Sequence, residues 1–247
     1  MALHHNPRIV SDGLVAAYDA ADINSYPGSG TTWYDLSGNG YHMTLNSAAT
    51  WVSQGPGSHM NFENGIAKYL PGGVLTNIPN ANGAGTICIY STIKAPDGDW
   101  KTLIRATTTG PNPGDDHQVI IFSDDGISLG MYDNNGGGFI DTGFNMNSIT
   151  NYTSAFHFYA WKLLNASPFY QFFYDGNLSS SSGTLTNSNA TFTQGFASIG
   201  AYHNGSNSST SFSQEWGKIA LFLYYDRLLS ESELRQNYLA QKSRFGL

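Results

Sequence analysis

The 247-residue sequence is poor in charge, in cysteine and in long apolar runs. Charged residues make up only 12% of it, against about a quarter in an average soluble domain. The formal net charge is −7 and the few Lys and Arg residues form no cluster, which argues against a nucleic-acid-binding protein. No run approaches the roughly 20 apolar residues of a membrane-spanning helix, and the first residues lack the pattern of a signal peptide. We therefore expect a soluble protein made in the cytosol that binds neither nucleic acid nor membrane.

Cysteine occurs once, as Cys88 within the apolar stretch "TICIYSTI". A single cysteine cannot form an internal disulfide, which excludes a disulfide-stapled secreted module. We expect Cys88 to pack as a small buried hydrophobic residue.

Aromatic residues (14%), glycine, serine, threonine and asparagine are abundant instead. Short strand-like runs such as "GLVAAYDA", "GTICIYSTIKA", "FHFYAWKLLN" and "KIALFLYYD" alternate with turn signals such as "SGNG" and "PDGD". This pattern predicts an all-β fold, an antiparallel two-sheet jelly-roll sandwich. Because no linker or internal repeat divides the pattern, we expect an N-terminal arm over residues 1–9 and a single domain over residues 10–247.

A short helix is predicted after the last strand. Ser230 followed by Glu233 forms a capping-box pattern, and Leu234 and Tyr238 share one helical face. We expect this helix to lie against the rim or open end of the sandwich.

Several of the expected strands are apolar on both faces, whereas a free sandwich normally presents one polar face to water. The chain's own loops, a glycan or a neighbouring subunit could cover the second face. From the third possibility we predict an assembly interface that contains the following aromatic residues: Phe156, Phe158, Phe172, Phe222 and Tyr224.

The two ends of the chain carry recognisable motifs. They are "GLVAAYDAAD" and "SYPGSGTTWYDLSGNGYHMTL" near the start, and "EWGKIALFLYYDRLLSESELRQNYLAQKSRFGL" at the end. These motifs resemble the laminin-G-like, concanavalin A-type jelly-roll domains of structural proteins from tailed bacteriophages. The resemblance spans nearly the whole chain and implies a virion protein on the predicted fold. The same fold also carries lectins and glycosidases, so the resemblance says less about function.

Catalytic patterns are missing from the sequence. Members of this fold that hydrolyse β-glucans carry a Glu-x-Asp-x-x-Glu strand signature, which is absent here. There is no Gly-x-Ser-x-Gly nucleophile elbow, and the glycine-rich "NNGGGF" lacks the Lys-Ser/Thr of a phosphate-binding loop. We therefore expect no enzymatic activity.

A structural calcium ion is the one cofactor that the sequence supports. Oxygen ligands cluster at Asp19, Asp22 and Asn24, and paired aspartates follow in "GDDHQ" and "SDDG". Laminin-G-like domains can hold one Ca²⁺ at the rim of the sandwich. The alternative is that these side chains cap backbone N–H groups in turns.

A glycan site would require exposed aromatic residues beside polar side chains. Tyr202, His203 and Asn204, which open the polar segment "HNGSNSS", form the best group, and Trp100 is a further candidate. Trp33 lies in the "TTWYDLSG" motif and is expected to be buried.

Together these observations predict a non-catalytic virion protein. A capsid decoration (cement) protein ranks first, followed by a small tail-fibre or appendage component, and its partners would be other virion proteins and further copies of itself, as a trimer. The alternative is a carbohydrate-binding, lectin-like module that recognises host surface glycans. A polysaccharide-degrading enzyme is a third reading, and we expect no release of reducing sugar.

Overall fold

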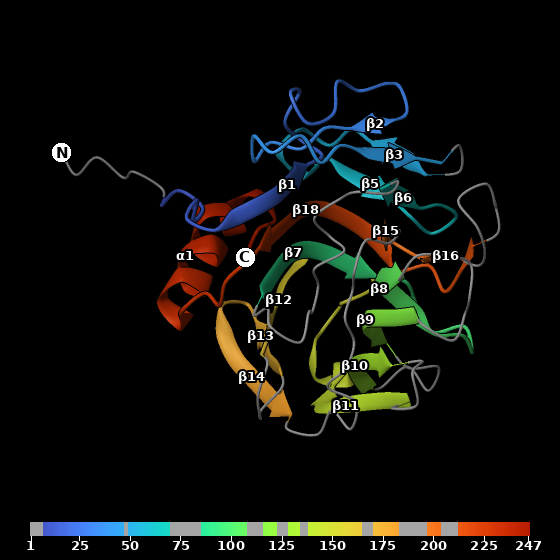
Figure 1. Cartoon of the computed structure of the whole chain (residues 1–247), viewed down its shortest axis with the longest axis vertical. Helices are drawn as coiled ribbons and strands as arrows, with labels where there is room; N and C mark the ends of the chain where they lie inside the picture. Colours follow the sequence, from blue (N-terminus) through green and yellow to red (C-terminus); the bar gives the residue numbers. More distant parts are fainter. Residues whose placement is uncertain are drawn as a thin grey trace.

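A computed structural model describes residues 7–46, 49–69, 85–107, 116–122, 128–133, 138–164, 170–182, 197–203 and 212–247. The described residues form two eight-stranded antiparallel sheets, a small two-stranded sheet and one short helix near the C-terminus (Figure 1). The all-β prediction with a C-terminal helix is confirmed at this level. No helix within these ranges is both long and apolar enough to cross a lipid bilayer.

Sheet A contains the central strands of the molecule. Its order is β14-β13-β12-β7-β18-β5-β4, and β1 pairs with β18 beside this path. The bounds are β1 Leu14–Asp19, β4 Thr50–Val52, β5 His59–Asn61, β7 Gly85–Ile93, β12 His157–Leu163, β13 Tyr170–Tyr174, β14 Asn177–Ser182 and β18 Gly217–Tyr225.

Sheet B has the order β11-β10-β9-β8-β15-β6-β3-β2. The bounds are β2 Thr32–Trp33, β3 Met43–Leu45, β6 Ala67–Tyr69, β8 Lys101–Thr107, β9 Asp116–Phe122, β10 Ser128–Asp133, β11 Gly138–Asn145 and β15 Ala197–Ile199. The two-stranded sheet joins β16 (Tyr202–His203) and β17 (Phe212–Ser213).

Alternate residues of Sheet A fill two separate cores. In β7, where all nine residues are buried, Ile87 and Ile89 point into a core shared with Sheet B, which contributes Leu103 and Ile104. Cys88 and Tyr90 point to the opposite side, into a second core. This is the period of two that a strand imposes on its side chains. The prediction of strands apolar on both faces, and that of a buried Cys88, are confirmed.

The second core is covered by the chain itself. Helix α1 (Glu231–Gln241) lies on the side of Sheet A that faces away from Sheet B (Figure 1), and its Leu234 is fully buried there. Phe158 belongs to this core, whereas Phe172, Phe222 and Tyr224 belong to the core between the sheets. All four are at most 2% exposed. The prediction that they form an assembly interface is therefore wrong, because α1 and the second sheet already cover both faces.

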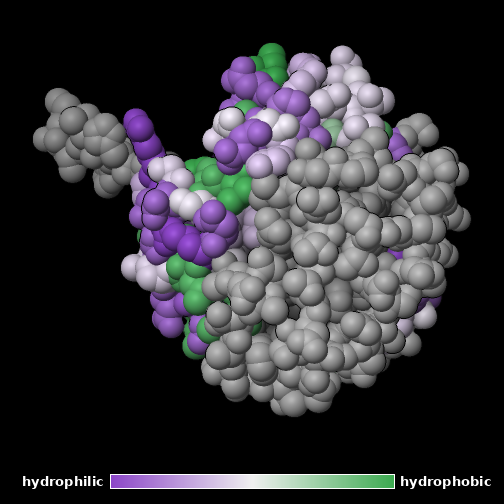
Figure 2. Space-filling view, in the orientation of Figure 1, coloured by the Kyte–Doolittle hydropathy of each residue, from purple (hydrophilic) through white to green (hydrophobic). Residues whose placement is uncertain are grey.

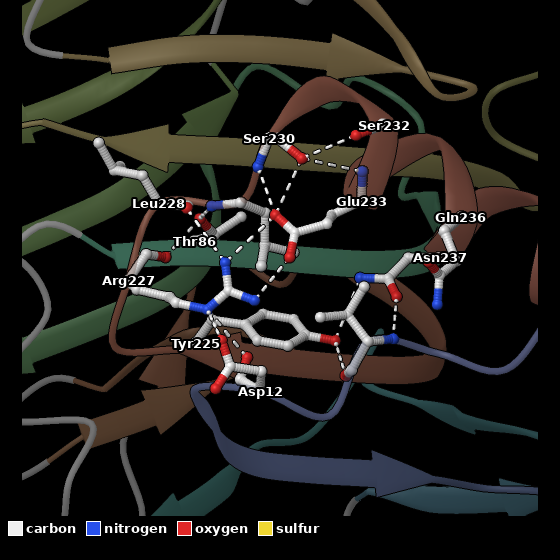
Figure 3. Close-up of polar contacts among 12 residues, drawn as sticks. Asp12, Thr86, Tyr225, Arg227, Leu228, Ser230, Ser232, Glu233, Gln236 and Asn237 are labelled. Atoms are coloured by element: carbon white, nitrogen blue, oxygen red, sulfur yellow. Dashed lines mark hydrogen bonds and ion pairs between the residues drawn. The ribbon is translucent and has the colours of Figure 1, made fainter.

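Helix α1 begins at the predicted capping box. The Ser230 hydroxyl accepts a hydrogen bond from the N–H of Glu233, and the Glu233 carboxylate accepts one from the N–H of Ser230 at 2.7 Å. The same carboxylate pairs with Arg227 at 2.6 Å (Figure 3). This pairing is the largest cause of the lowered pKa of Glu233, about 2. The first turn of α1 is thus tied to the end of β18.

The N-terminal motif is organised by Asp35. Its carboxylate accepts hydrogen bonds from the N–H groups of Ala17, Ser37 and Tyr41, at 2.9 to 3.1 Å. The neighbouring Trp33 is fully buried, as predicted. The buried Asp35 thus helps to hold the "WYDLSGNG" turn against β1, together with Ser37 and Asn39, whose side chains donate to the carbonyl of Val15 at 2.7 and 2.9 Å.

Candidate functional site

A surface pocket of about 640 Å³ opens beside the C-terminal turn. Its lining comes from three distant segments: the 3₁₀ turn η1 (Gly55–Gly57) with the preceding Gln54, the residue Phe156 before β12, and the end of the chain around the 3₁₀ turn η5 (Lys242–Arg244). The lining residues are Gln54, Pro56, Gly57, Phe156, Ser243, Arg244 and Phe245. In the space-filling view, hydrophobic residues interrupt a largely hydrophilic surface around the helical segment (Figure 2).

Two aromatic rings supply the apolar part of the pocket. The centroids of Phe156 and Phe245 lie 5.2 Å apart. Phe245 stacks on the buried Tyr90 at 4.6 Å, and Phe156 packs against the buried His59 at 5.2 Å. Both rings are half-buried and supported from below, so they offer fixed apolar surfaces to a ligand.

Arg244 forms the polar wall of the pocket. Its guanidinium group binds both carboxylate oxygens of Asp19, at 2.6 and 2.8 Å. Its Nε donates to the carbonyl of Pro56 at 2.9 Å, and its Nη1 also donates to Oε1 of Gln241 at 2.8 Å. These contacts fix η5 to both β1 and η1, and they set the shape of the pocket.

His59 lies beneath the pocket as a neutral ring. The side chain is buried, and burial is the largest cause of its lowered pKa, with the charge of Lys218 acting in the same direction and Glu63 and the Gly57 carbonyl opposing it. Because that carbonyl, at 3.1 Å, can only accept, Nδ1 is the protonated nitrogen. The buried ring under Phe156 is therefore the neutral form of His59, with its proton on Nδ1.

This arrangement predicts a loss of stability in mild acid. The pKa of His59 lies below its ordinary value of 6.5 in the folded state, so the folded state binds fewer protons than the unfolded state below about pH 6.5. The contribution of neutral His59 to the free energy of unfolding is therefore fully present above that pH, and it is lost as the pH falls through the folded-state pKa. We expect His59→Gln to flatten the dependence of the melting temperature on pH between 6.5 and 5. Phe245→Leu, which leaves the Phe156 ring packed on His59, should lower the melting temperature and retain the slope. A slope unchanged in His59→Gln would contradict this assignment.

The lining combines apolar rings with polar groups. The lining residues that the structure describes include no carboxylate, thiol or imidazole, and the adjacent Asp19 is engaged by Arg244. Ser243 and Gln54 are exposed residues of the lining. The pocket can therefore hold an amphipathic ligand with an apolar face and hydrogen-bonding groups.

The structure does not bring the three residues predicted to bind calcium together at one site. Asp22 and Asn24 lie together, because the Asp22 carboxylate accepts hydrogen bonds from the backbone N–H and the side-chain amide of Asn24 at 2.8 and 3.0 Å. Asp19 turns instead to Arg244 and is not available as a third ligand. Among the described residues, no three His, Cys, Asp or Glu side chains come together as metal ligands would.

The residues predicted to bind a glycan lie in two different settings. The Tyr202 ring is half-buried beneath the guanidinium group of Arg105, 4.2 Å from its centroid. Trp100 is half-buried and meets Phe139 edge to face at 5.0 Å. His203 ends strand β16, and Asn204 lies outside the described residues. The role of this group in binding remains a prediction.

The main residues of the pocket were not identified from the sequence. The sequence predicts Phe156 as an assembly residue, and it shows Arg244 and Phe245 only as part of the C-terminal motif. The structure also shows an exposed aromatic pair, Tyr34 and His42, whose rings lie 5.1 Å apart. The alternation around the buried Trp33 could have identified Tyr34 as outward-facing.

Comparisons with known proteins show the fold but no family. No protein-family model and no curated protein matches the chain. Among solved structures, the chain is similar to Trypanosoma rangeli sialidase in complex with sialic acid, with a TM-score of 0.63 and 16% identity over 98% of this chain and 36% of that one. It is also similar to a binding domain of botulinum neurotoxin serotype D/C, with a TM-score of 0.61 and 10% identity over 93% of this chain and 53% of that one. The chain thus spans about a third of the sialidase and half of the toxin domain structure.

Proposed function

We propose that this chain is a non-catalytic carbohydrate-binding module built on a jelly-roll sandwich of the concanavalin A and laminin G type. The observation that carries the proposal is the pocket at the C-terminal turn, where two supported aromatic rings stand beside an amide, a hydroxyl and a guanidinium group. A sugar ring has an apolar face of C–H groups that packs on aromatic rings, and hydroxyls that need hydrogen-bond partners at the edge. The similarity of the fold to a sialidase and to a toxin binding domain lends support.

Binding to a glycan array, with and without a chelator, tests this proposal first. We expect binding to selected glycans that a chelator does not abolish, and no release of reducing sugar from the bound polysaccharide. Binding that requires calcium would favour a metal-dependent site elsewhere on the chain. Release of reducing sugar would overturn the non-catalytic assignment.

The pocket itself is tested by Phe156→Ala. Loss of one of the two rings should weaken glycan binding about tenfold, since an aromatic contact contributes about 0.5 to 1.5 kcal/mol beyond the area that it buries. Tyr34→Ala is the matched control, because Tyr34 is an exposed aromatic residue outside the pocket lining. Calorimetric titration of both variants, after a melting check of the fold, separates the two sites. Full binding by Phe156→Ala, with a loss in Tyr34→Ala, would move the site to the Tyr34 and His42 pair.

We further propose, from the resemblance of the end motifs, that the module acts in a phage virion, with capsid decoration ahead of a tail appendage. The apolar strand faces no longer support this location, because the chain covers them itself. Cryo-EM of purified virions tests the location. Ordered copies at capsid lattice positions would support decoration, and copies confined to the tail would support an appendage.

A further inference from the structure

The charge balance of the pocket bears on which class of sugar it can hold. Among the described residues that line it, Arg244 alone is charged, and this side chain and that of Asp19 are each only 16% exposed. The carboxylate binds the guanidinium through both oxygens, and its Oδ1 also accepts from the N–H of Ala21 at 2.9 Å. The two charges therefore cancel at the wall of the pocket.

The hydrogen-bonding capacity of Arg244 is almost fully used within the protein. A guanidinium group has five N–H donors. Nε donates to Pro56, the two Nη1 donors go to Asp19 and Gln241, and one Nη2 donor goes to Asp19. One Nη2 donor is left for a ligand, which is enough for a hydroxyl but does not provide the two-pronged contact that a carboxylate prefers.

The other described residues that line the pocket add no further positive charge. The nearby Lys242 places its ammonium group 5.5 Å from the ring centroid of Tyr238 on α1. An acidic sugar would lose the hydration of its carboxylate on entering a site with no net charge, beside the carboxylate of Asp19. The free-energy cost of desolvation is far smaller for a neutral sugar ring.

We infer that the pocket takes a neutral hexopyranose and rejects acidic sugars. This inference rests on the proposed carbohydrate-binding function and specifies its ligand. The apolar face of the sugar lies on Phe156 and Phe245, and its hydroxyls meet the Gln54 amide, the Ser243 hydroxyl and the remaining Nη2 donor of Arg244. The Asp19 carboxylate acts as a specificity-determining group, because it occupies the guanidinium that an acidic sugar would need.

Titration calorimetry of the whole chain with two sets of sugars tests the inference. The neutral probes are methyl glucoside, methyl galactoside and methyl mannoside, and the acidic probes are N-acetylneuraminic acid and glucuronic acid. We expect at least one neutral probe to bind with an affinity that does not change between 50 and 500 mM salt, and the acidic probes to bind at least tenfold more weakly. Tighter, salt-sensitive binding of an acidic probe would overturn the inference and leave the proposed function standing. Absence of binding by both sets, and by the glycan array, would overturn both.

A charge-matched pair of variants provides the second test. Asp19→Asn keeps an acceptor for Ala21 but frees the Arg244 charge, so affinity for the acidic probes should rise at least tenfold and become salt-sensitive. Asp22→Asn makes the same change in net charge in the neighbouring turn, where the carboxylate contacts Asn24 and not Arg244, and should leave selectivity unchanged. Equal effects of the two variants would show that only the overall charge matters and would overturn the role given to Asp19. The salt dependence of the wild-type chain decides the question if Asp19→Asn does not fold.

Discussion

Replacing Gly200 with alanine should destabilise the domain by about 3 to 5 kcal/mol, the sum of an overpacked core and a strained backbone. Gly200 has φ +94°, and a methyl group there would lie 2.8 Å from both Cβ and Cδ1 of the fully buried Phe62, and closer still to its Cγ. The backbone cannot move away easily, because its N–H donates to Leu103 and its carbonyl accepts from Trp216, at 2.8 and 2.7 Å. Chemical denaturation measures the loss.

Gly38 offers the matched control for this prediction. Its φ is +93°, almost the same as that of Gly200, but a methyl group there would meet nothing within 4 Å. Gly38→Ala should therefore cost only the backbone strain, about 1 to 2 kcal/mol. If the two variants lose equal stability, the contact with Phe62 is not the cause.

Asn237→Ala is the second substitution expected to have a large effect, a loss of about 2 to 4 kcal/mol, because it leaves buried polar groups without partners. Asn237 is 1% exposed. Its Oδ1 accepts from the N–H of Val10 at 2.8 Å, and its amide donates to the Tyr225 hydroxyl at 3.1 Å. That hydroxyl in turn donates to the carbonyl of Val10 at 2.9 Å, which closes the network drawn in Figure 3.

The adjacent Gln236 provides the comparison for Asn237. It also holds the N-terminal segment, by donating to the carbonyl of Arg8 at 2.7 Å, but this contact is exposed. Gln236→Ala should cost at most about 1 kcal/mol, since water replaces the lost partner. Hydrogen exchange at the Val10 amide should accelerate strongly in Asn237→Ala and little in Gln236→Ala. Similar exchange in both variants would contradict the importance of the buried network.

The parts of the structure that depend on local sequence were predictable. The capping box at Ser230 and Glu233 depends on spacing within one turn, and the burial of Cys88 and Trp33 follows from alternation within a strand. The pairing of strands was less accessible, because it is set by contacts between residues far apart in the chain. The apolar strand faces were correctly recognised, but the cover that α1 provides could not be seen in the helix sequence alone.

The pocket was not predictable for the same physical reason. Its rings come from Phe156 and Phe245, and its polar wall depends on an ion pair between Asp19 and Arg244, which are 225 positions apart. Nothing in the local pattern around Asp19 distinguishes a calcium ligand from the partner of a distant arginine. Only the packing of η5 on η1 and β1 decides between them.

The position of β18 in Sheet A has a consequence for how the protein forms during synthesis. This strand, residues 217–225, lies between β7 and β5 and also pairs with β1. The middle of the sheet therefore stays open while the first 216 residues leave the ribosome, and the edges of β7, β5 and β1 that pair with β18 have no partner until then. Such long-range pairing slows folding and exposes unpaired strand edges. The nascent chain therefore depends on protection from aggregation until β18 has been synthesised and has paired with β7, β5 and β1.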